Sequence, residues 1–365
     1  MISIIGGGLG GLMLARVLVS NGIEVLVFEG DASRAARHQG GMLDLHVESG
    51  QAALRAGGLF EGFRARVLAE GDATRVMDRD GRVLLDERGN DGRPEIERGA
   101  LRDLLIDSLP DGVIRWDHRL HEIQRDGDAF EIAFANGRTH RATALVGADG
   151  ASSKVRPLVS SAKPAYAGIS FVESRITRAK ELHPRLAAVV GAGSLFALSP
   201  GKAILAHREP NDEICAYAAL TAPIEELERL DEARALSEFG GWNEDLRGLI
   251  AAHDGPLVVR AILALPVGHR WPRVPGVTLV GDAAHLMSPF AGEGANLALF
   301  DGAELARAII EHPGDVEAAF ATYEAAMFDR SALAAAESVQ GIGLCFGDDA
   351  PHSLLRFFAS HGEPG

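Results

Sequence analysis

The chain has 365 residues, of which 47% are hydrophobic, which is enough for a full core and two domains. Its formal net charge of -15 disfavours nucleic acid or an anionic membrane surface as a partner, and no apolar run is long enough to span a bilayer. The two cysteines, Cys215 and Cys345, cannot form a disulfide framework, and a strand pattern begins at Ile2 without room for a signal peptide, so we expect a cytoplasmic protein.

Residues 1–29 predict a strand, a glycine-rich turn, a helix and a second strand. Gly6, Gly8 and Gly11 satisfy the pattern G-x-G-x-x-G between the first strand and the helix. The pyrophosphate of a dinucleotide would rest on the N-terminus of that helix, where backbone N–H groups are unpaired. Glu29 ends the second strand at the distance expected for an acid that binds ribose. The alternative, a glycine-rich turn without a ligand, is disfavoured by this context.

Residues 34–50 are basic at first and then contain Gly40 and Gly41, which suggest a close approach of the backbone to a ring. Arg37 is a candidate contact to a pyrophosphate or ribityl group. A solvated basic loop followed by a strand is an equally good interpretation of this segment. A helix is expected at 49–58, and short strands at 67–85 belong to no βαβ unit, so a second lobe begins there.

A helix is expected over residues 93–109, with Leu101, Leu104 and Leu105 on its apolar face. Arg98 and Arg102 lie four residues apart on one side of it. They form either a solvated face or a pair directed at a cofactor crevice. Residues 113–142 then predict a β-meander, with turns at 126–128 and 136–137.

A second turn near the nucleotide is expected at residues 148–156, where an apolar strand ends at Asp149 and Gly150. From 164 to 266 the composition changes to alternating strands, with one helix expected at 223–239. We interpret this region as a substrate lobe. Its core or its apolar pocket would contain Phe171, Leu195, Phe196, Leu198 and Tyr217.

The segment 277–301 predicts a buried strand, a loop and a helix. Asp282 follows the strand, where its carboxylate can accept hydrogen bonds from a polyol, and Gly292 and Gly294 allow backbone to approach a flat ligand. The helix that follows directs its positive dipole end at the loop, which would stabilise developing negative charge. His285 is interpreted as a structural histidine in preference to a general base. A long Ala-rich helix at 315–346 would brace the two lobes, and the tail after it would form a short amphipathic turn.

Three motifs carry a family resemblance: GGGLGG near residue 6, ADGASSKVR at 148–156 and VGDAAHLMSPFAGEGAN at 280–296. In this order and spacing they resemble the group A FAD-dependent aromatic hydroxylases, a PHBH-like family. The chain looks closest to the tetracycline-inactivating flavin monooxygenases, through GGMLDLHVESGQ at 40–51, RPEIERGALRDLLIDSL at 93–109, GDAAHLMSPFAG and YEAAMF in the C-terminal helix.

The resemblance implies an α/β fold with a Rossmann-like FAD-binding domain, a β-sheet substrate domain and a C-terminal bridging helix. The FAD-binding domain would comprise residues 1–68, 93–160 and 268–312, the substrate domain 69–92 and 161–267, and the bridging helix 313–346.

The resemblance also implies roles for individual residues around FAD. Glu29 would bind the adenosine ribose, and Asp282 the ribityl or pyrophosphate region. Positions that contact FAD in the tetracycline-inactivating enzymes match Arg37, Asp44 and Arg102. Pro289 would lie beside the flavin ring. The backbone around the pyrimidine edge of the ring would be that of Gly292, Gly294, Ala295 and Asn296.

The implied reaction inserts one atom of O2 into an aromatic or polyketide-like small molecule, with NADPH or NADH as a transient hydride donor. It would proceed through a flavin C4a-hydroperoxide, so no catalytic side chain or metal is expected. Gly30 stands where the tetracycline-inactivating enzymes have an arginine that meets the nicotinamide cofactor, so docking of the donor differs. The alternatives are a flavin-dependent dehydrogenase or reductase, and a flavin-bound protein that sequesters a ligand without turnover. A halogenase is disfavoured because Trp271 stands alone, without the Trp-x-Trp signature.

Overall fold

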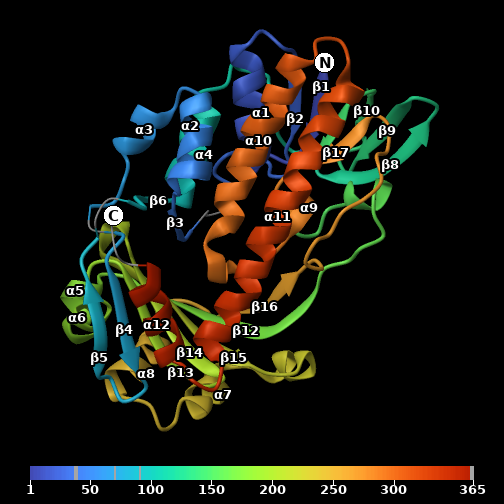
Figure 1. Ribbon diagram of the computed structural model, residues 1–365. Coiled ribbons are helices and arrows are strands. Elements are labelled where there is room, and N and C mark those ends of the chain that lie inside the picture. The colour runs from blue at the N-terminus through green and yellow to red at the C-terminus, as the bar shows by residue number, and fades with distance from the viewer. Residues whose placement is uncertain (37–39, 70, 90–91, 362–365) are drawn as a thin grey trace. The chain divides into compact units, whose positions relative to one another are not determined.

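A computed structural model of the chain describes residues 1–36, 40–69, 71–89 and 92–361 (Figure 1). The chain folds into two compact units, each assembled from three separate segments. The first unit comprises Met1–Arg66, Arg98–Ala165 and Leu263–Ser338. The second unit comprises Val67–Glu97, Tyr166–Ile262 and Val339–Gly365. A parallel sheet in one unit and a separate, mostly antiparallel sheet in the other confirm the predicted α/β fold class.

The first unit is organised around a five-stranded parallel sheet of order β17-β11-β1-β2-β7. Its strands are β1 (Ile2–Ile5), β2 (Val25–Phe28), β7 (Ile114–Arg115), β11 (Leu145–Gly147) and β17 (Val277–Leu279). Every residue of β1 is buried, as expected for a central strand covered on both faces. Because parallel strands end at the same edge, the loops that follow β1, β2, β11 and β17 meet there. Those loops carry the glycine-rich turn, Glu29, the Asp149 turn and Asp282.

Two helices of this unit, α1 (Leu9–Ser20) and α10 (Glu293–Glu311), lie side by side (Figure 1). Glycine permits the close approach, since a Cβ on Gly10 would lie 2.6 Å from the backbone oxygen of Ala298. The strand, helix and second strand predicted for residues 1–29 are confirmed. The contact also brings the start of α10 to the sheet edge at which α1 begins.

The first unit also contains a small antiparallel sheet and several short helices and turns. The predicted meander is confirmed as an antiparallel sheet of β8 (Leu120–Asp126), β9 (Ala129–Phe134) and β10 (Thr139–Ala142). The predicted helix at 93–109 begins only at Arg98, because residues before it form the strand β6 (Glu95–Glu97), which is counted with the second unit. The other elements are β3 (Met42–Asp44), the π-helical turn η1 (Val47–Gln51), α2 (Ala52–Ala56), α3 (Phe60–Arg64), α4 (Arg98–Asp107), η2 (Arg156–Leu158), α9 (Asp282–His285) and η5 (Pro289–Ala291).

The second unit contains a seven-stranded sheet of order β16-β12-β15-β14-β13-β4-β5, in which β4 and β13 pair in parallel. Its strands are β4 (Thr74–Asp78), β5 (Val83–Glu87), β12 (Ala165–Ile176), β13 (Ser194–Ser199), β14 (Lys202–Glu209), β15 (Glu213–Thr221) and β16 (Val258–Ala264). Alternate residues of these strands pack with helices into one apolar core. The helices are α5 (Ala179–Leu182), α6 (Pro184–Val190), α7 (Glu232–Glu238) and α8 (Glu244–Ala251).

The single helix predicted at 223–239 is wrong. A 3-10 helix, η4 (Ile224–Arg229), comes first, and α7 begins only after Asp231, whose side chain accepts the N–H of Arg234 at 2.8 Å. Asn243 caps α8 in the same way, accepting the N–H of Asp245 at 2.9 Å. Capping side chains therefore divide this region into short helices, whereas apolar periodicity alone suggested one continuous helix.

The long C-terminal helix is confirmed as α11 (Val316–Phe346), and a further helix, α12 (His352–His361), follows it. The part of α11 through Ser338 belongs to the first unit and the part from Val339 to the second. Its bracing role stays a prediction. Among the helices that the structure describes, none combines the length and the apolar character needed to cross a membrane.

Candidate cofactor site

The glycine-rich turn between β1 and α1 has the geometry of an anion-binding loop. Gly6 has φ +111°, and a Cβ there would lie 2.2 Å from the Ala148 oxygen, so no other residue fits. A Cβ on Gly11 would lie 2.3 Å from the Gly6 oxygen. Gly8 caps α1 without a side-chain hydrogen bond, which leaves the first N–H groups of the helix available to a phosphate.

Glu29 and Arg102 flank this turn and are both buried. The carboxylate of Glu29 accepts the N–H of Gly7 at 2.6 Å and the N–H of Asp31 at 2.8 Å. Arg102, on α4, donates from Nε to the Gly7 oxygen at 3.2 Å. Its Nη2 is buried without a hydrogen bond to the described residues, 3.6 Å from Asp31 Oδ2 and 3.8 Å from Glu29 Oε2. These two carboxylates lie at ion-pair distance but accept no hydrogen bond from Nη2, and a buried donor that makes no hydrogen bond is costly, so this atom suits the phosphate or hydroxyl oxygen of a dinucleotide.

The turn after β11 uses its own carboxylate. Asp149 accepts from the Ser153 hydroxyl at 2.5 Å and from the Lys154 N–H at 2.7 Å, so its side chain shapes the turn. Burial raises the pKa of the Asp149 carboxyl, although these hydrogen bonds oppose the shift. Arg156, also buried, donates to the oxygens of Asp282 and Ala151 at 2.9 Å each. It therefore joins the Asp149 turn to the loop that carries Asp282.

Asp282 begins α9 directly after the last parallel strand, and it is partly exposed. Burial raises the pKa of its carboxyl, while the nearby charges of His285, Arg98 and Arg156 oppose that rise. A carboxylate held at this sheet edge is suited to accept hydrogen bonds from the hydroxyls of a polyol.

A buried ion network holds the Asp282 loop in place. Asp301, on α10, accepts from the Gly281 N–H at 2.9 Å, from His285 Nε2 at 2.6 Å and from Arg330 Nη2 at 2.8 Å. Burial would lower the pKa of His285, but the Asp301 carboxylate more than offsets this and raises it. Burial would likewise raise the pKa of Asp301, yet pairing with His285 and Arg330 holds it low. The contact gives His285 a structural hydrogen bond, and its role as a structural histidine in preference to a general base stays a prediction.

Sequence reasoning missed Asp301 and Arg330. The available signal was an acid inside the apolar run LALFDGAEL, where an unpaired carboxylate would be costly.

The start of α10 contacts the segment after β3. Gly292 has φ +69° and caps α10, and a Cβ there would lie 3.2 Å from Asp44 Oδ2. Asn296 is fully buried: its Oδ1 accepts the His46 N–H at 3.0 Å, and its Nδ2 donates to the Asp44 oxygen at 2.9 Å. The side chain of Asn296 thus joins two parts of the chain. A Cβ on Gly294 would meet no atom of the described residues within 4 Å, so this side is open.

The predicted cofactor residues therefore gather at one edge of the parallel sheet. Pro289 begins η5, which Gly292 caps at its C-terminal end, and Ala295 lies in the first turn of α10. Arg37 lies outside the described residues.

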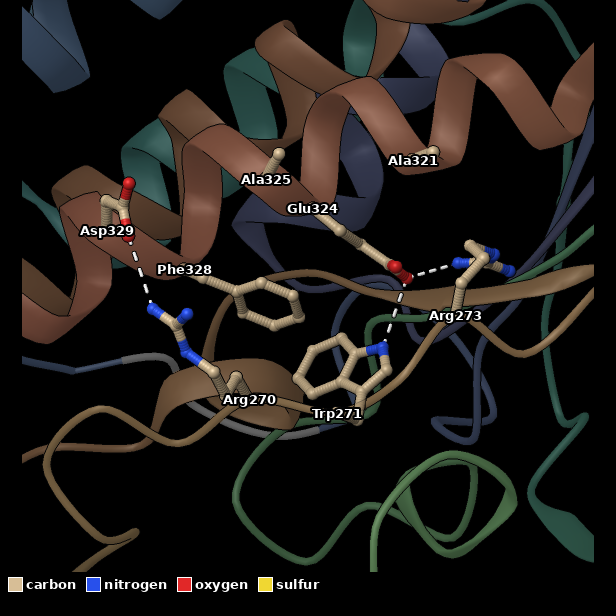
Figure 2. Close-up of a pocket in the computed structure, with 8 residues that line it drawn as sticks. All are labelled: Arg270, Trp271, Arg273, Ala321, Glu324, Ala325, Phe328 and Asp329. Carbon is tan, nitrogen blue, oxygen red and sulfur yellow. Dashed lines mark hydrogen bonds and ion pairs between the residues drawn. The ribbon is translucent and has the colours of Figure 1, made fainter.

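A separate pocket of about 420 Å³ lies between residues 270–273 and α11 (Figure 2). Glu324 accepts from Trp271 Nε1 at 3.1 Å and from the Thr278 hydroxyl at 2.7 Å, and it also pairs with Arg273. Arg270 pairs with Asp329 at 3.2 Å on the exposed side. The charged side chains that line this pocket, Arg270, Arg273, Glu324 and Asp329, form ion pairs with one another. These pairs attach residues 270–273 to α11, so we do not assign a ligand to this pocket.

The candidate substrate residues lie in the second unit. Strand register places Phe196 and Tyr217 on the same face of the sheet, each opposite Leu205, and the rings of Tyr217 and Phe171 are 5.4 Å apart. Burial raises the pKa of the Tyr217 hydroxyl, so it stays protonated. Leu195 does not fit the same pocket: successive strand residues alternate, and Leu195 packs in the core with the helices on the other face.

Comparison with known proteins agrees with this geometry. Residues 1–336 match the family model described as "FAD binding domain". Monooxygenase asqM of Emericella nidulans is 30% identical, over 84% of this chain and 82% of that one. Klebsiella pneumoniae HpxO complexed with FAD and uric acid has a TM-score of 0.81 at 21% identity, covering 100% of this chain and 94% of that one. Tetracycline destructase Tet(55) has a TM-score of 0.79 at 22% identity, covering 99% and 94%. The chain therefore belongs to the FAD binding domain family and is related to monooxygenases such as asqM, and it shares its fold with HpxO and tetracycline destructase Tet(55).

Proposed function

We propose that this protein uses NADPH or NADH and FAD to insert one oxygen atom of O2 into an aromatic or polyketide-like small molecule. One observation carries the proposal. The open N-terminus of α1, the buried Nη2 of Arg102, which makes no hydrogen bond to the described residues, and the carboxylate of Asp282 converge at the carboxyl edge of one parallel sheet. This donor and acceptor set suits the pyrophosphate and polyol of a dinucleotide.

FAD, when bound, supplies hydride acceptance and oxygen activation. The side chains that we assign to it bind and orient. Gly6, Gly8 and Gly11 bring the backbone of the turn and the first N–H groups of α1 to the pyrophosphate. Arg102 Nη2 donates to a phosphate oxygen. Glu29 accepts a hydrogen bond from the ribose, and Asp282 accepts from the ribityl hydroxyls.

Near the ring, the start of α10 stabilises negative charge. Its dipole and free N–H groups would face the pyrimidine edge, where reduction places charge. We assign contacts with the pyrimidine edge to five residues at or just before the start of α10: Pro289, Gly292, Gly294, Ala295 and Asn296. Asp149 acts through the turn that it shapes, and Asp44 through its contact with Gly292. Arg37 stays a candidate contact.

We infer the substrate class from three aromatic side chains of the second unit. Phe171, Phe196 and Tyr217 share an apolar face of its sheet, which suits a flat aromatic or polyketide-like ring. The reaction needs no nucleophilic side chain. The task of these residues is to hold the ring of the substrate and to exclude water.

The test measures NADPH and NADH consumption by the FAD-loaded protein against a panel of phenols, quinolones and tetracyclines, with the mass of each product. We expect a ligand of this class to stimulate NAD(P)H oxidation and to gain one oxygen atom. The mass of the product should rise further when isotopically labelled O2 is supplied. Stimulated oxidation with a product that carries no label would instead identify a dehydrogenase or reductase. If the bound flavin can be reduced by dithionite but no ligand of the panel stimulates NAD(P)H oxidation, the proposed substrate class is contradicted.

A further inference from the structure

His46 contacts a carboxylate with each of its ring nitrogens. Its Nε2 lies 3.0 Å from Asp44 Oδ2, and its Nδ1 lies 2.9 Å from Glu293 Oε1. The side chain is only 7% exposed. A neutral imidazole has one N–H and one acceptor nitrogen, whereas an ionised carboxylate only accepts. Both contacts are hydrogen bonds at once only when the ring carries two N–H groups, so the geometry indicates a cationic His46.

The same residue is held through its backbone. The His46 N–H donates to Asn296 Oδ1 at 3.0 Å, and Asn296 Nδ2 donates to the oxygens of Asp44 at 2.9 Å and Gly292 at 3.0 Å. Gly50 leaves room for this amide, since a Cβ there would lie 2.3 Å from Asn296 Oδ1. The segment Asp44–His46 is thus fastened to the first turn of α10, although about 250 residues separate the two in sequence.

We propose that His46 is a positioning residue of the FAD site, whose protonated ring locks the Asp44 segment onto the start of α10. This inference rests on the proposed cofactor site, because Asp44, Gly292 and Asn296 belong to it. When His46 loses its proton, one carboxylate faces a nitrogen lone pair and the second contact becomes repulsive. The loop then separates from α10, and the affinity for FAD falls.

The charges around the ring fix the direction of the pH effect. Two charged groups among the described residues contact the ring: Asp44, the last residue of β3, and Glu293, in the first turn of α10. Gln51 of η1 and Asn296 in the first turn of α10 hydrogen-bond to the backbone of Leu45 and His46, and both are neutral. Both charged neighbours favour the protonated ring. The pair of contacts is therefore complete at low pH and is lost as the pH rises through the titration of His46 in the folded protein.

The experiment titrates FAD into apoprotein and measures its dissociation constant by flavin fluorescence, from about pH 6 to about pH 9, across the range where histidine titrates. We expect wild-type affinity to fall as the pH rises. The side chain in His46→Gln cannot be charged. At about pH 6 this variant should bind FAD at least about tenfold more weakly than wild type, which corresponds to the loss of one charged hydrogen bond. Its dissociation constant should not change with pH. His121→Gln changes an exposed histidine of the same unit and should match wild type.

A second variant keeps the test informative if His46→Gln folds poorly. Glu293→Gln preserves an acceptor for the ring but removes one negative charge, so the fall in affinity should move to lower pH. An unchanged dissociation constant and pH profile in His46→Gln, with FAD still bound, would overturn the inference and leave the FAD site intact. Absence of FAD binding by wild type at every pH would instead contradict the proposed site itself.

Discussion

Replacement of Asp301 by asparagine tests the network that holds the Asp282 loop. The carboxylate is fully buried and accepts from Gly281, His285 and Arg330 at once. An asparagine is neutral and offers one acceptor oxygen, so the buried His285 and the half-buried Arg330 lose their counter-charge. Breaking a buried pair in this way typically destabilises by about 3–5 kcal/mol. That is a large fraction of the roughly 5–15 kcal/mol by which most domains are stable.

The assay is urea denaturation of the apoprotein, followed by circular dichroism and tryptophan fluorescence. Asp329→Asn is the matched control, because it makes the same chemical change in an exposed ion pair. Asp329 pairs with Arg270, and the side chain of Asp329 is 82% exposed. Exposed pairs contribute little, so the control should unfold at the wild-type midpoint. If Asp301→Asn also unfolds at the wild-type midpoint, the network does not contribute the stability that we assign to it.

The pH dependence of this difference has a defined sign. The pKa of Asp301 is held below its ordinary value of 3.8, so its contribution is present above that pH and is lost as the pH falls through the folded value. The pKa of His285 is raised above its ordinary value of 6.5, so its contribution is present below that pH and is lost as the pH rises through the folded value. Wild type and Asp301→Asn should therefore differ most between about pH 4 and about pH 6.5.

Three further outcomes are expected. Arg102→Met should weaken FAD binding by about 10- to 100-fold, the loss of a charged hydrogen bond, in a fluorescence titration; an unchanged affinity would contradict a role for Nη2. Gly6→Ala should abolish FAD binding or soluble expression, since its methyl would lie 2.2 Å from the Ala148 oxygen, whereas Gly343→Ala, with nothing within 4 Å, should retain both. Cys215 and Cys345 are buried and each has a pKa raised to about 12, so neither should react with a thiol reagent before the protein unfolds; rapid reaction of the native protein would show that the interior opens.

The glycine-rich turn and the acid that follows β2 could be predicted from the sequence because their signals are local, whereas their contacts with a cofactor stay predictions. A glycine pattern between a strand and a helix, and an acid at the end of the next strand, depend on neighbours a few residues away. Gly6, Gly11 and Glu29 accordingly lie where the pattern indicated. The helix of Arg102 was also predicted, with Leu101 buried on its apolar face, although its start was placed five residues too early.

The parts that escaped prediction depend on partners far along the chain. His46 meets Glu293 across 247 residues, and Asp301 meets Arg330 across 29. In the sequence His46 is one more residue after Asp44, and Asp301 is one more acid on a helix. Strand alternation caused a different miss: Leu195 and Phe196 are neighbours of similar character, but they occupy opposite faces of β13, and register decides which faces the core.

The order of strands in the parallel sheet has a consequence for biosynthesis. The strand β17 begins at Val277, yet it pairs with β11, which in turn pairs with β1 near the N-terminus. During synthesis, the edge of β11 that will pair with β17 therefore stays without its partner strand while more than a hundred further residues are translated. Any nascent chain that stops before β17 also lacks Asp282 and α10. Such a truncated product can form the glycine turn but cannot complete the cofactor cradle, and its unpaired strand would invite aggregation or degradation.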